Sequence, residues 1–111
     1  MMKQLRLFWT PAGFGRYSYL RAWLFIDGQR YSIANIRGNK FTLLLEILKG
    51  LKFKLVALDE IETEIEDELA EVMEILFSLR GRFPKKYIKL KDNPKELLAE
   101  LRAFRISNEM R

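Results

Sequence analysis

The dipeptide Asp27-Gly28 stands between two runs of residues typical of β-strands, 17–26 and 29–36. A two-residue connection of this composition favours a type I′ turn, because both central residues must adopt a positive φ angle. The sequence therefore predicts a tight β-hairpin over residues 17–36, and any fold of this chain has to accommodate it.

Side chains alternate between the two faces of a strand, so pairing counted outward from the turn gives the hairpin two different faces. One face carries rings and cations: Tyr17, Tyr19, Arg21, Trp23, Phe25, Arg30, Ser32, Ala34 and Ile36. The other is mainly aliphatic, as a core face would be: Ser18, Leu20, Ala22, Leu24, Ile26, Tyr31, Ile33, Asn35 and Arg37. A register slip of one residue would exchange the two faces.

The other segments predict further strands and helices. Alternating patterns predict strands at 3–9 and 52–58, and apolar residues at helical spacing predict helices at 41–51, 59–79 and 95–104, with a short strand at 87–90 as an option. We therefore expect one α+β domain over residues 1–111. Its antiparallel sheet would have three to five strands in β-ββ-α-β-α-(β)-α order and would pack on helices.

The chain of 111 residues contains no cysteine and no histidine. Disulfides, thiolate metal ligands and cysteine nucleophiles are therefore excluded, and the commonest general base is absent. The segment 55–60 resembles a Walker B strand, but no GxxxxGK[ST] phosphate loop accompanies it. The acids of 59–68 could bind a hard metal through oxygen, or could form the solvated face of a helix. We expect the second, and so neither an enzyme, a cofactor nor a bound metal.

Charge is divided unevenly along the chain, although the net charge is only +5. Residues 1–57 sum to +8, residues 58–77 to −9 and residues 78–111 to +6. Such asymmetry indicates separate surfaces with separate partners. The low content of thermolabile residues, with 32% charged residues, is typical of heat-adapted proteins. No apolar run is long enough for a membrane span and no secretion signal is recognisable, so we expect a cytoplasmic protein.

The face with rings and cations predicts single-stranded DNA or RNA as the partner, since rings stack on bases and cations neutralise phosphates. Strand 3–9 and the neighbouring loops would extend it. The candidate binding residues are Arg6, Phe8, Phe14, Arg16, Tyr17, Tyr19, Arg21, Trp23, Phe25, Arg30 and Lys40. The alternative interpretation makes these rings the core, because aromatic residues are common in strands for packing alone.

The predicted helix at 59–79 offers a second candidate surface. Its apolar stripe would pack within the subunit or form a homodimer or higher homo-oligomer: Ile61, Ile65, Leu69, Val72 and Leu76. Its acidic flank supports an alternative function, in which the chain is a small regulator or inhibitor that binds a basic protein partner.

The rings and cations at 17–25, together with the helix from Ile61 to Phe77, resemble the ThermoDBP-related single-stranded-DNA-binding proteins of hyperthermophiles. The resemblance is one of architecture and covers about half of the chain. It implies an oligomer that holds single strands in a cleft lined by rings and cations.

Overall fold

A five-stranded antiparallel sheet is the centre of the fold in the computed structural model, which describes residues 1–15, 18–79 and 83–109. The strand order is β3-β2-β1-β5-β4. The bounds are Met2–Ala12 for β1, Tyr19–Ile26 for β2, Gln29–Ile36 for β3, Lys54–Ala57 for β4 and Glu60–Glu66 for β5. The predicted α+β class and antiparallel sheet are confirmed.

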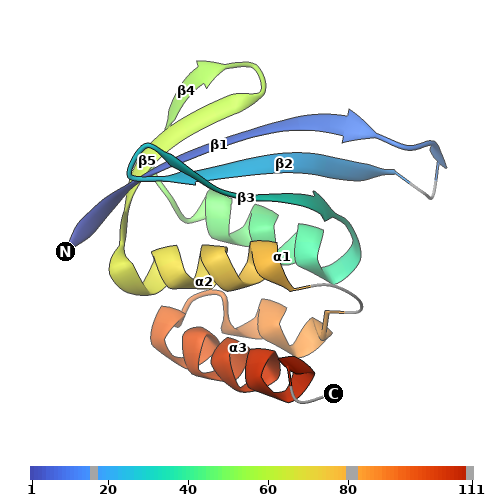
Figure 1. The fold of residues 1–111 in the computed structure, drawn as a ribbon, viewed down its shortest axis with the longest axis vertical. Helices are drawn as coiled ribbons and strands as arrows, with labels where there is room; N and C mark the ends of the chain where they lie inside the picture. Colours follow the sequence, from blue (N-terminus) through green and yellow to red (C-terminus); the bar gives the residue numbers. More distant parts are fainter. Residues whose placement is uncertain (16–17, 80–82, 110–111) are drawn as a thin grey trace.

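Helices cover one face of this sheet in two successive layers (Figure 1). The first layer holds α1, Gly38–Lys49, and α2, Asp67–Ser78. The second holds the 3-10 helix η2, Lys85–Leu90, and α3, Pro94–Glu109, which packs along α2. Within the described ranges no helix lies on the other face of the sheet, which we call the open face.

The predicted hairpin is confirmed in its turn and in its first pairs. Asp27 has φ 52° and Gly28 has φ 81°, as a type I′ turn requires. Phe25 pairs with Arg30, as counted from the sequence.

Beyond these pairs a β-bulge changes the register. Leu24 pairs with Ser32, which leaves Tyr31 as the extra residue of β3. The predicted faces of β3 are therefore wrong past the bulge: Ile33 lies opposite Trp23 on the open face, and Ile36 is fully buried on the covered face.

The helix predicted at 59–79 is wrong in its first half. Residues 60–66 form strand β5, which pairs with β1, and only Asp67 onward is helical. Alternate residues Ile61, Thr63 and Ile65 are buried, whereas the glutamates between them lie on the open face. Residues 60–66 form an inner strand of the sheet because β1 provides hydrogen-bonding partners for them. The local sequence does not reveal these partners.

The other predicted elements differ at their ends or in type. Residues 87–90 belong to the 3-10 helix η2 rather than a strand. Helix α1 begins at Gly38, three residues before the predicted start. Helix α3 begins at Pro94, one residue before the predicted start, and extends beyond the predicted end.

One continuous hydrophobic core holds the layers together. Leu5, Leu7 and Leu24 from the sheet pack on the apolar sides of α1 and α2 and are almost fully buried. Beyond α2, the rings of Phe83, Tyr87 and Phe104 meet edge to face or tilted, with centroids 5.2 to 6.1 Å apart.

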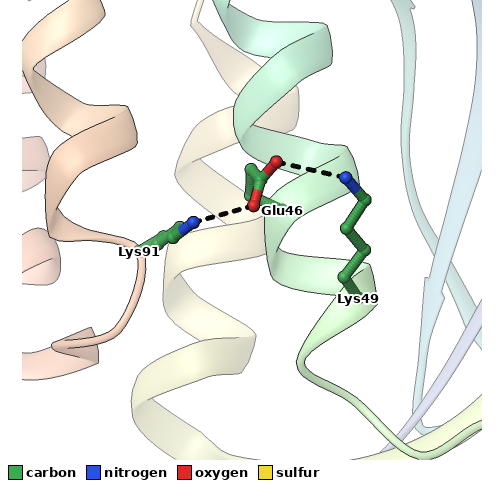
Figure 2. Close-up of polar contacts among 3 residues, drawn as sticks. All are labelled: Glu46, Lys49 and Lys91. Carbon is green, nitrogen blue, oxygen red and sulfur yellow. Dashed lines mark hydrogen bonds and ion pairs between the residues drawn. The ribbon is translucent and has the colours of Figure 1, made fainter.

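A polar contact also connects the two helical layers (Figure 2). Glu46 of α1 accepts hydrogen bonds from Lys49, at 3.3 Å, and from Lys91, which follows η2, at 2.9 Å. The two ammonium groups lower the pKa of the Glu46 carboxyl, with the Lys91 hydrogen bond as the larger cause.

None of the helices in the described part of the chain is both long and apolar enough to span a bilayer.

Candidate nucleic-acid interface

Three rings stack on one another across the open face. Phe8 of β1 lies opposite Trp23 of β2, with ring centroids 4.9 Å apart and planes inclined by 11°. The Phe8 ring also stacks with that of Phe25, at 5.6 Å and 19°. Phe25, Phe8 and Trp23 thus form a continuous stack, which we call the aromatic row.

A guanidinium group lies over each outer ring of the row. The Arg6 Cζ atom is 5.8 Å from the Phe25 centroid, and the Arg21 Cζ atom is 5.9 Å from the Trp23 centroid. Both distances are within the range of a cation–π interaction. The row therefore ends in a positive charge on each side.

The aromatic row faces solvent rather than a helix. Arg6 and Arg21 are exposed, and the three stacked rings are partly buried. On the same strands Leu7, Ala22 and Leu24 point to the opposite side and are buried in the core. The alternative interpretation, in which the rings form the core, does not describe this structure.

An acidic stripe borders the row along β5. Glu60 lies opposite Phe8, and Glu62 lies opposite Arg6, so both carboxylates share the open face with the rings. The Arg6 Nε atom donates a hydrogen bond to Glu60, and this bond is the main cause that raises the Arg6 pKa. The predicted helix at 59–79 did not anticipate this stripe. The strict alternation of acids over 60–66 is typical of a strand with one acidic face. No three acidic side chains in the described part of the chain gather as a metal-binding group.

A depression of about 1390 Å³ adjoins the other end of the row. Its lining comes from β2, β3, the start of α1, the end of α2 and the segment before η2. Arg21 and Arg37 line it, together with Tyr19, Ile33 and Asn35. The described lining residues include no Asp or Glu, so the depression is positively charged.

The structure brings most of the predicted binding residues together. On the open face, as predicted, lie Arg6, Phe8, Tyr19, Arg21, Trp23, Phe25 and Arg30. Phe14 is exposed in the loop after β1. Arg16 and Tyr17 lie outside the described residues. Ile33 and Asn35, which the β-bulge turns toward this face, were not predicted.

The Lys40 side chain does not reach the aromatic row, although Lys40 is among the residues that line the depression. It is buried in the first turn of α1, where its Nζ atom donates a hydrogen bond to the carbonyl oxygen of Leu79 at the end of α2. Burial lowers the Lys40 pKa. An ammonium group at a helix C-terminus is stabilised by the helix dipole, so Lys40 has a structural role as a cap.

The predicted oligomer stripe is also placed differently. Four of its side chains are almost fully buried within the chain and so cannot contact another subunit, whereas Leu69 is only partly buried: Ile61, Ile65, Leu69, Val72 and Leu76. They are buried because β5 and α2 both contribute to the core. Large exposed apolar side chains occur instead around β4: Phe53, Leu55, Val56 and Leu58.

The fold and the site define an α+β domain with a one-sided sheet, whose uncovered face carries stacked rings, arginines and a bordering acidic stripe. No protein-family model, curated protein or solved structure matches this chain. Inference about its function therefore starts from the open face.

Proposed function

We propose that this protein binds single-stranded DNA or RNA on the open face of its sheet. The observation that carries the proposal is the aromatic row, which lies uncovered with an arginine over each outer ring. Bases have flat π-faces of the same kind, and a base stacked on an aromatic side chain contributes about 1–3 kcal/mol. A duplex keeps its bases stacked internally, so this surface favours single strands.

The charge pattern supports the same partner. The cations of the open face near β2 and β3, Arg21, Arg30 and Arg37, are exposed and would contact phosphates. Binding that neutralises phosphates releases counterions, so the affinity falls as the salt concentration rises. The acidic stripe on β5 repels phosphates and directs the strand away from that side.

The two tryptophans provide a direct test, because they lie on opposite faces of the sheet. Trp23 belongs to the aromatic row, whereas Trp9 packs partly buried against the core. In a fluorescence titration with a mixed-sequence oligonucleotide, the Trp9→Phe variant should be quenched and the Trp23→Phe variant should not. The affinity should decrease between a low and a high salt concentration. Absence of both quenching and a gel shift at low salt would refute the proposal.

Ring removal provides the matched control. Phe8→Ala removes the central ring of the row and should weaken binding to every sequence, whereas Phe53→Ala removes an exposed ring near β4 and should not. Equal affinity of the two variants would show that the row is not the contact surface. Parallel titrations with DNA and RNA of the same sequence decide between the two polymers.

The acidic stripe favours a second candidate, a module that binds a basic protein. Its four carboxylates lie on one side of β5, where they would face such a partner together: Glu60, Glu62, Glu64 and Glu66. A stoichiometric protein captured after nuclease treatment, and lost when Glu62 and Glu64 are changed to Gln, would support this candidate. A partner retained by that variant would exclude it.

The architectural resemblance to ThermoDBP-related proteins supports the first candidate only through the sheet with its rings and cations. The part of it that rested on a helix from Ile61 does not hold, since β5 occupies 60–66. The proposal therefore depends on the open face and not on that resemblance.

A further inference from the structure

We infer that one base stacks on the Trp23 end of the aromatic row and that the strand continues from there into the depression beside β3, toward Arg37. This inference rests on the proposed function and adds the place and direction of the strand. Its basis is a difference between the two ends of the row.

At the Phe25 end, the arginine is already neutralised. Arg6 is paired with Glu60 and lies opposite Glu62. A phosphate that approached Arg6 would meet these carboxylates and would have to replace an existing ion pair. Arg6 therefore offers little attraction for a nucleic acid.

At the Trp23 end, the arginine, Arg21, has no ion-pair partner among the described residues. Its guanidinium lies over the Trp23 ring. One face of Trp23 is occupied by Phe8, so a base would stack on the other face as Arg21 moves aside to contact the adjacent phosphate. Arginine suits this exchange, because its planar group can both stack on rings and bind phosphate.

The depression supplies the continuation of the path. It begins at Arg21, whose guanidinium lies over Trp23 at the end of the row, and extends along β3 to Arg37, just before α1. Its described lining residues include no carboxylate. Tyr19 and Asn35 add polar groups to its wall. Its volume of about 1390 Å³ is larger than a typical small-molecule pocket and accommodates more than one nucleotide.

Paired charge removals test the inference. Arg21→Gln and Arg37→Gln should each lower the affinity for a mixed single-stranded DNA about tenfold and reduce the slope of log affinity against log salt by about 1. Arg6→Gln removes the equivalent charge at the Phe25 end, where it is already paired with Glu60, and should change the affinity less than about twofold. In a Glu60→Gln background Arg6 is released, so the loss caused by Arg6→Gln should increase there. Urea unfolding of each variant confirms that it is folded.

The results separate the two levels of the proposal. If wild-type protein binds but Arg6→Gln costs as much as Arg21→Gln, the strand uses both ends and the inference is wrong while the proposed function stands. If Arg37→Gln has no effect, the path into the depression is wrong. If the wild-type protein does not bind any single strand, both proposals fail.

Discussion

Phe8 and Trp23 stand directly opposite each other on neighbouring strands, and their stacked rings fill the middle of the only face of the described sheet that no helix covers. Each ring thus shields one face of the other from solvent, and both rings remain partly exposed. The two residues link the stability of the sheet to the surface proposed to bind nucleic acid.

The Phe8–Trp23 contact should be measurable as a coupling energy. Stacked aromatic pairs contribute about 0.5–1.5 kcal/mol beyond the burial of their area, so a double-mutant cycle of Phe8→Leu and Trp23→Leu should show a coupling of that size. Urea unfolding measures it. A cycle of Phe8→Leu with Phe14→Leu, which is exposed in a loop, should be additive. Additivity in both cycles would mean that the stacking does not contribute to folding.

Thr63 tests the strand assignment of β5. Its side chain is buried, and its Oγ1 atom donates a hydrogen bond of 2.5 Å to the carbonyl oxygen of Lys52, just before β4. Thr63→Val keeps the shape but removes the donor, so the free energy of unfolding should fall by about 1 kcal/mol. The matched control is Thr42→Val on the exposed side of α1, which should change it by less than about 0.5 kcal/mol. Equal effects would contradict a specific role for the buried hydroxyl.

Lys40 should be important for stability. Lys40→Met leaves the Leu79 carbonyl without its partner, and the free energy of unfolding should fall by about 1–3 kcal/mol, whereas Lys95→Met on exposed α3 should have little effect. Burial lowers the Lys40 pKa below its value in the unfolded chain, so the unfolded state binds more protons between these two pKa values. Wild-type stability should therefore gain from this group as the pH rises through that alkaline interval, and Lys40→Met should lack the gain.

Tyr31 should titrate at unusually high pH. Its hydroxyl donates a hydrogen bond to Glu74 of α2, and this bond, with burial and the Glu74 charge, raises the Tyr31 pKa to about 12. The folded state therefore retains a proton that the unfolded state loses near pH 10.0, so this contribution to stability is complete below pH 10 and declines as the pH approaches 12.

Absorbance difference titrations of wild type against Tyr31→Phe isolate this phenol, and Glu74→Gln should move its pKa back toward 10. Urea midpoints between pH 9 and 11 should fall more for wild type than for Glu74→Gln. A Tyr31 pKa unaffected by Glu74→Gln would show that the hydrogen bond is not its cause.

Local sequence signals explain which parts of the fold and site were predicted. The turn at Asp27-Gly28 depends on the φ preferences of two residues, and the alternation in β2 depends only on the period of a strand. The rings and arginines of β1 and β2 therefore lie on the predicted face. The spacing of Ile61, Ile65 and Leu69 is different, since a separation of four residues suits both a helix and a strand. Thr63 and the alternating glutamates distinguish the two, but the decisive partner of β5 is β1, more than fifty residues away in the chain.

Taken alone, the amino-acid sequence determined the hairpin turn, the faces of β1 and β2 and the absence of cysteine and histidine chemistry, because these depend on neighbouring residues or on composition. Tertiary structure decided that 60–66 is a strand, that the bulge at Tyr31 turns Ile33 outward and that Lys40 is buried. It also decided that, among the described residues, Arg6 forms an ion pair and Arg21 does not. These features depend on contacts between segments far apart in the chain. The energy of such contacts is set by burial and partner atoms, which local residue patterns do not specify.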